Sequence, residues 1–129
     1  MVSEIRSKDE LIALLIDHDG VGDGTHPITD PTWPLQALIM QRPKGHVFTK
    51  HTHKDMERTV ATLQEAVLVT KGKLGVTVCD KSGNDLGRYD VAEGQCLFLV
   101  NGGYKLEVLD DVRFFEFKNG PYADDKLDL

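Results

Sequence analysis

Three observations in the sequence predict an all-β fold, an antiparallel sandwich or barrel. Short apolar segments recur at regular spacing from Leu35 onward, and glycine, asparagine and aspartate residues separate them. No segment between them has a convincing amphipathic helical period. Many short strands without intervening helices are typical of antiparallel sandwiches and barrels. With 129 residues, the chain is long enough for one domain with a core and too short for two ordinary domains.

The first 34 residues are predicted to form an N-terminal extension made of one strand and one loop. Glu10 to Asp17 is an apolar run rich in leucine and isoleucine, which fits a buried strand or two turns of helix. We expect a strand. Asp17 to Pro34 contains three glycines and three prolines, so it is predicted to be a loop long enough to be functional.

Residues 35–118 are predicted to form the barrel core, and residues 119–129 a C-terminal tail. The predicted strands are Leu35 to Gln41, Val47 to His53, Gln64 to Thr70, Leu74 to Asp80, Gly87 to Val91, Gln95 to Val100, Tyr104 to Leu109 and Val112 to Lys118. Turn residues lie between several of these strands, at Lys81 to Asp85, Glu93 and Gly94, Asn101 to Gly103, and Asp110 and Asp111. Residues 54–63 are polar without clear alternation and are predicted to form a loop or ragged strand across the barrel mouth.

Composition and charge exclude several classes of partner. The net charge of −6 and the pI near 5.3 give no global attraction to nucleic acid or to an anionic membrane. Apolar runs are far shorter than a membrane span, and early charged residues interrupt any signal-peptide pattern. A soluble, cytoplasmic protein is therefore expected. Cys79 and Cys96 are too far apart for a CxxC motif and are expected to be buried free thiols.

His51, His53 and Glu65 form the most informative pattern in the chain. Residues two apart on a strand point to the same face, so the two imidazoles can meet one metal ion. Two histidines and one carboxylate are a recognised ligand set for transition metals, often iron(II) with open positions. All five histidines lie within the first 53 residues, so the C-terminal half offers no imidazole as a fourth ligand.

The spacing around this triad resembles the first motif of the cupin superfamily. Five residues separate Gly45 from the His-x-His pair, and six residues separate Glu65 from Gly72. The gap between His53 and Glu65 is eleven residues, where the family usually has three or four. The segment 54–64 is therefore interpreted as an insertion at the barrel mouth.

The second cupin motif is degraded in this chain. Gly94 and Gly102 match the family, but Val100 occupies the position of its proline and no histidine follows. Strict counting puts the histidine position at Lys105, and a shift of one residue puts it at Tyr104. Alternation favours Tyr104 as the inward residue.

The resemblance implies a jelly-roll barrel with His51, His53 and Glu65 as ligands of a divalent metal such as iron, manganese, nickel or zinc. Three possibilities remain for the fourth ligand. Water fills the position, or Tyr104 supplies a phenol oxygen or a hydrogen bond to bound water, or the metal has been lost and a polar pocket binds a ligand directly. The resemblance also implies a homodimer, with the N-terminal strand as an element that is exchanged.

These expectations lead to two candidate functions. The first is a metal-dependent isomerase or oxygenase for a small oxygen-rich metabolite, either anionic or carbohydrate-derived, with Glu65 and Tyr104 as catalytic residues. Its substrate-binding residues would be Arg42, Lys50, Arg58 and Tyr104, because a basic rim favours a carboxylate or phosphate. The second is a non-catalytic ligand-binding or sensing protein that has lost its metal chemistry.

Overall fold

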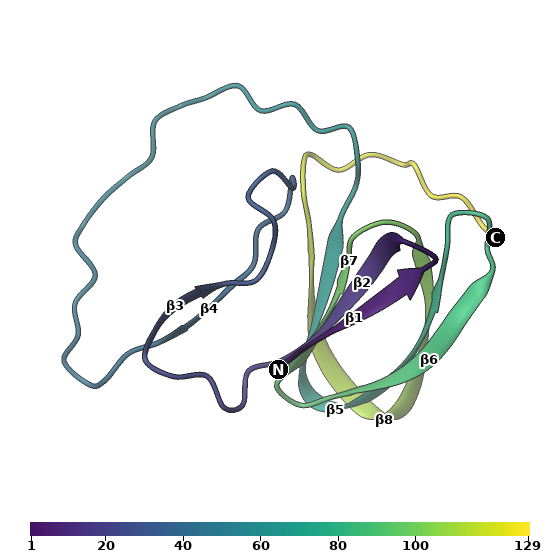
Figure 1. The fold of residues 1–129 in the computed structure, drawn as a ribbon, viewed down its shortest axis with the longest axis horizontal. Helices are drawn as coiled ribbons and strands as arrows, with labels where there is room; N and C mark the ends of the chain where they lie inside the picture. The colour runs from purple at the N-terminus through teal and green to yellow at the C-terminus, as the bar shows by residue number, and fades with distance from the viewer.

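The protein, described here by a computed structural model that covers residues 1–129, consists of β-strands joined by loops (Figure 1). The strands are β1 (Val2–Ser7), β2 (Glu10–Asp17), β3 (Gly24–Pro27), β4 (Leu38–Gln41), β5 (Glu65–Cys79), β6 (Asp85–Ala92), β7 (Gln95–Leu99) and β8 (Gly103–Lys118). No helix is present, so the prediction of an all-β fold is confirmed. There is accordingly no helix with the length and apolarity needed to cross a membrane.

Six of the strands form one antiparallel sheet that curls into a half-barrel (Figure 1). The order is β1-β2-β7-β5-β6, and β8 pairs along the other edge of β5. The remaining strands, β3 and β4, pair only with each other and form a separate arm beside the barrel. Antiparallel pairing in a curled sheet fits a jelly-roll-like barrel, as the sequence predicted.

Strand β5 is the central strand of the barrel because it changes neighbours along its length. Its first residues pair with β7, its last residues pair with β6, and β8 follows it throughout. The register between β5 and β8 shifts around Lys71, where β5 bends. Gly72 lies at this bend with φ +80°, and a β-carbon there would overlap the carbonyl group of Asp111. The bend therefore requires glycine.

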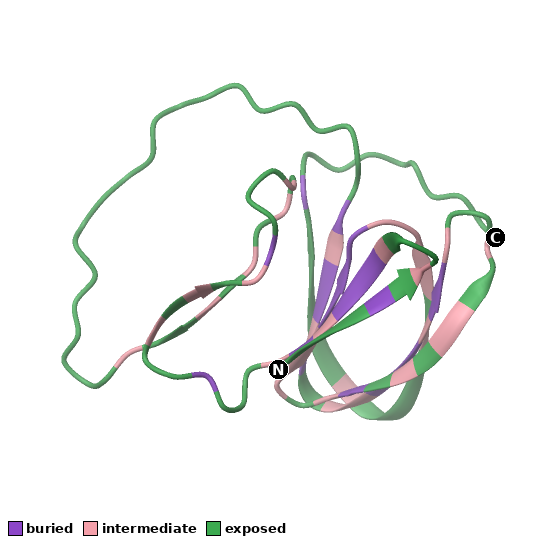
Figure 2. Cartoon of the chain, viewed as in Figure 1, coloured by how far each residue is buried: buried purple, intermediate pink, exposed green.

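The two faces of the sheet bury two apolar clusters. Figure 2 shows that the buried residues lie mainly on the strands of the barrel, whereas the long segment before β5 is exposed. The inner cluster lies inside the curl and consists of Ile5, Ile12, Ala13, Val67, Val69, Leu74, Val76, Val78, Val91, Leu97 and Leu99. The outer cluster is centred on Phe98. Ile39 of β4 and Trp33, in the connection between β3 and β4, pack against this cluster. Because neighbouring strand residues point to opposite faces, Val67 belongs to the inner cluster and Ala66 to the outer one.

The prediction of a strand from Val47 to His53 is wrong. The segment has no regular structure, and Val47 and Phe48 are exposed. These are the only two apolar residues of the segment, and because they are adjacent they would point to opposite faces of a strand. Neither face of such a strand would have a row of apolar side chains to bury, so pairing with the sheet would bury little apolar surface.

Other predicted boundaries also change. Glu10 to Asp17 is a strand as predicted, whereas β1 and β3 were not predicted. The segments on either side of Asp110 were predicted to be two strands separated by a reversal, and this is wrong, because β8 runs through them. The two predicted strands within β5 are likewise continuous. Bulges let both long strands bend together, with Asp110 opposite Lys73, so the chain needs no turn there.

Candidate functional site

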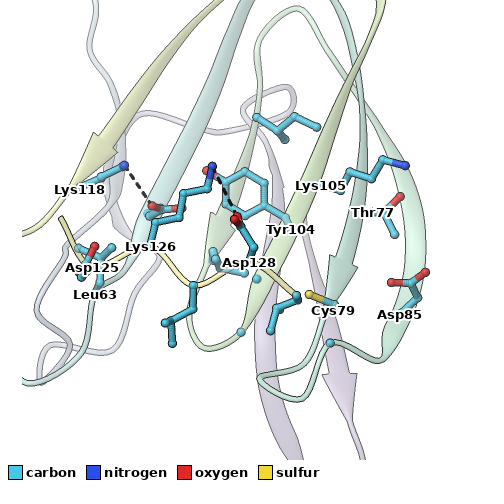
Figure 3. A pocket seen from close by; sticks show the side chains of 18 of the residues that line it. Leu63, Thr77, Cys79, Asp85, Tyr104, Lys105, Lys118, Asp125, Lys126 and Asp128 are labelled. Atoms are coloured by element: carbon cyan, nitrogen blue, oxygen red, sulfur yellow. Dashed lines mark ion pairs between the residues drawn. The ribbon is translucent and has the colours of Figure 1, made fainter.

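A pocket of about 850 Å³ lies between β5, β8 and the C-terminal segment (Figure 3). Its polar wall includes Glu65, Tyr104, Glu116 and Lys118, and the tail residues 125–129 line the opposite side. Figure 3 shows the side chains of Lys126 and Asp128, from the tail, projecting over Tyr104 in this view. The pocket therefore has one wall made of strands and one made of a segment without regular structure.

The pairing of β5 with β8 explains how the polar residues meet. Glu65 begins β5 and lies directly opposite Lys118, the last residue of β8. Glu116 is two residues before Lys118, so both side chains point to the same face. Tyr104, near the start of β8, packs against the inner apolar cluster, as alternation predicted, while Lys105 is exposed. Glu65 and Tyr104 are thus brought to one pocket.

Tyr104 is held by a hydrogen bond. Its hydroxyl group donates to Oε1 of Glu116 at 3.0 Å. Burial raises the pKa of Tyr104 far above its ordinary value, and the negative charges of Glu65 and Glu116 raise it further. The phenol therefore keeps its proton at neutral pH and acts as a hydrogen-bond donor.

Lys118 links the two carboxylates of the pocket. Its Nζ lies 3.4 Å from Oε1 of Glu65 and 3.7 Å from Oε1 of Glu116. The charges of Glu116 and Glu65 raise the pKa of Lys118, so the ammonium group stays protonated. The Glu65 side chain is only 16% exposed, against 49% for Lys118. A mostly buried carboxylate is thus compensated by an ammonium group that is half in solvent.

His51 and His53 lie outside this pocket. Both are exposed on the segment between β4 and β5, which makes a wide excursion from the barrel (Figure 1). Their ring centroids are 5.3 Å apart in an edge-to-face arrangement, and His51 Nδ1 is 2.8 Å from the carbonyl oxygen of Thr49. No group of three or more His, Cys, Asp or Glu side chains is arranged to hold a metal ion. As placed here, the two histidines and Glu65 do not fit a three-ligand metal site.

The predicted basic residues also lie away from the pocket. Arg42 donates hydrogen bonds to Thr25 Oγ1 at 2.8 Å and to the carbonyl oxygen of Gln41 at 3.0 Å, so it stabilises the β3–β4 arm. Lys50 and Arg58 are exposed on the same long segment as the histidines. None of the three lines the pocket. Their predicted role in binding a substrate stays a prediction.

Glu116 and Lys118 are the site residues that sequence reasoning missed. The available signal was the alternation of Glu116 and Lys118 with Phe115 and Phe117, which marks a strand with one polar face. The register that places this face opposite Glu65 involves residues far apart in the chain, and the alternation alone does not fix it.

Comparison of the chain with family models, with curated proteins and with solved structures found no match. The resemblance to cupins therefore rests on the spacing of the motif residues.

Proposed function

We propose that this protein binds a small, oxygen-rich metabolite in the pocket between β5, β8 and the tail. The observation that carries the proposal is the convergence of Glu65, Tyr104, Glu116 and Lys118 on one cavity of about 850 Å³. That volume is within the usual range for small-molecule sites, roughly 300–1,000 Å³. The apolar wall that accompanies these groups, with Leu99 and Leu106 among its members, fits such a site.

The chemistry of the four side chains suits hydroxyl groups on the ligand. The two carboxylates accept hydrogen bonds, the ammonium group donates them, and the phenol does both. Each of these groups makes a short-range interaction with another member of the set, so the wall is preorganised. A carbohydrate-derived metabolite carries the matching pattern of donors and acceptors. Binding without chemistry is the simplest function that uses these features.

A metal-dependent isomerase or oxygenase of the cupin type is the second candidate. The observation that favours it is the proximity of the two imidazoles, with ring centroids 5.3 Å apart, on a segment that leads directly into Glu65. Eleven residues separate His53 from Glu65. An extended segment of that length spans roughly 36 Å, so closure of the segment onto the barrel would unite the three side chains.

Two measurements test these proposals. For the binding proposal, the full-length protein labelled with ¹⁵N is titrated with monosaccharides, and shifts of amide signals around Glu65 and Glu116 are expected. If no signal at the pocket moves, the binding proposal is wrong. For the second candidate, the metal content of the purified protein is measured. Stoichiometric iron, manganese, nickel or zinc that is lost in the double variant His51→Ala, His53→Ala would favour the metal-dependent function.

A further inference from the structure

The charges around the pocket carry an inference about the ligand, and it rests on the proposed function. Five carboxylate side chains line the pocket, against three lysines and no arginine or histidine. The carboxylates are Glu65, Asp85, Glu116, Asp125 and Asp128, and the lysines are Lys105, Lys118 and Lys126. The pocket is therefore negative at neutral pH.

The negative balance does not depend on the tail. Without residues 125–129, three carboxylates still face two lysines. On the strand wall, Lys118 is shared between Glu65 and Glu116, so this cluster keeps one uncompensated negative charge. In the tail, Lys126 is 3.9 Å from Asp128, so the tail's lysine also lies near a carboxylate. Every lysine but Lys105 is thus already close to a carboxylate.

These observations distinguish between the anionic and the uncharged ligands that the sequence left open. A phosphate or carboxylate group in the pocket would meet the excess negative charge. Lys118 already contacts two carboxylates, and Lys105, the lining lysine without a carboxylate partner, is exposed to solvent. Hydroxyl groups carry no such penalty, because they can donate to Glu65 and Glu116. The basic residues that would favour an anion, Arg42, Lys50 and Arg58, are elsewhere.

We infer that the pocket selects a polyhydroxylated ligand without negative charge and discriminates against its carboxylated and phosphorylated analogues. Selection has two parts. Glu65, Glu116 and the phenol of Tyr104 provide hydrogen-bond partners for vicinal hydroxyl groups, and the excess carboxylates repel anions. A positively charged amino group on the same scaffold would be tolerated or favoured.

The test uses one ring scaffold that carries different charges. The ¹⁵N-labelled full-length protein is titrated with methyl glucoside, glucosamine, glucuronate and glucose 6-phosphate. We expect glucosamine to bind at least as tightly as methyl glucoside, and glucuronate to bind about fivefold more weakly, since one charge at contact distance in water is worth about 1 kcal/mol. Tighter binding of glucuronate or of the phosphate than of methyl glucoside would overturn the inference and leave the proposed binding function intact. If none of the four binds, the proposed function itself fails.

A charge variant provides the matched control. Glu116→Gln removes one negative charge and keeps an oxygen that accepts the hydrogen bond from Tyr104, so glucuronate is expected to gain about fivefold in affinity. Asp90→Asn removes an exposed carboxylate of β6 that does not line the pocket. This variant should leave the order of the four ligand affinities unchanged. If Glu116→Gln leaves the penalty on glucuronate unaltered, the pocket charges do not set the selectivity.

Salt provides a second readout that needs no variant. At about 0.5 M salt the Debye length falls to about 4 Å, so the difference between glucosamine and glucuronate should shrink while methyl glucoside is unaffected. A difference that persists at high salt would contradict the electrostatic origin of the selectivity.

Discussion

The hydroxyl group of Tyr104 donates a 3.0 Å hydrogen bond to Glu116, although the two residues lie towards opposite ends of the same long strand, β8. The curl of the sheet brings them together, because β8 follows the bend of β5. A phenol from one end of the strand and a carboxylate from the other therefore meet in one pocket.

Replacement of Tyr104 by phenylalanine tests the structural value of this hydrogen bond. The variant should lose about 1 kcal/mol of unfolding free energy at most, because Glu116 is exposed and water can replace the phenol as its partner. Urea denaturation measures the loss. Glu116→Gln retains an acceptor and should be nearer to wild type. A loss above about 3 kcal/mol in Tyr104→Phe would mean that the hydroxyl group has further buried partners.

Stability should fall steeply at alkaline pH. In the unfolded chain Tyr104 ionises near its ordinary pKa of about 10, whereas the raised pKa keeps the proton on the phenol of the folded chain. Above pH 10 the native state thus binds more protons than the unfolded state, and the free energy of unfolding decreases as pH rises. The raised pKa of Lys118 acts in the same direction.

The measurement is the slope of unfolding free energy against pH between about 9 and 11, around the ordinary tyrosine pKa. The slope should be shallower in Tyr104→Phe. Tyr122→Phe, which removes an exposed tyrosine of the tail, is the matched control. Equal slopes in wild type and Tyr104→Phe would show that the phenol does not retain its proton.

Metal titration distinguishes an exposed histidine pair from a closed three-ligand site. Nickel or zinc binding that depends only on the observed geometry should disappear in His51→Ala, His53→Ala and persist in Glu65→Gln, because Glu65 pairs with Lys118. Isothermal titration calorimetry on the three proteins gives the answer. Loss of binding in Glu65→Gln as well would mean that the segment closes on the barrel and joins the three ligands that the sequence motif predicts.

Gly72→Ala should be strongly destabilising, by roughly 3 kcal/mol or more, because it combines a positive φ with a backbone clash at Asp111. Gly22→Ala is the control, since Gly22 has open space around its α-carbon. Thermal unfolding of both variants measures the difference. Equal melting temperatures would mean that β5 and β8 can separate at the bend without cost.

Removal of residues 125–129 should open the pocket at little cost in stability. The tail makes no backbone hydrogen bond to the barrel, and its Leu127 and Leu129 are mostly exposed. The truncated protein should keep its melting temperature within about 2 °C, as expected for loss of an exposed end. It should also bind methyl glucoside with a faster association rate, measured by NMR line shape. A slower rate would mean that the tail takes part in binding.

Local sequence patterns predicted much of the barrel, but they did not predict the register between strands that are far apart in the sequence. The alternation and turn residues located β2, β6 and β7 closely, because these strands end at turns with readable chemistry. The histidine segment was misassigned because its residue spacing fits a strand although it has no apolar face to bury. Glu65 and Tyr104, which the motif names as site residues, both line the pocket, and their roles there stay predictions. Lys118 was missed because only its pairing with Glu65 reveals its role.

The pairing of β5 with β8 along the length of both strands has a consequence for the order in which the barrel assembles. The pair Cys79 and Gly103 closes a shorter stretch of chain than the pair Glu65 and Lys118 at the other end of the ribbon. Closing a shorter loop costs less chain entropy, so the pairing of β5 with β8 is expected to form first at Cys79 and then to extend towards Glu65. The residues proposed to recognise the ligand would then become neighbours only in the final steps of folding, and bound ligand would stabilise the part of the ribbon that forms last.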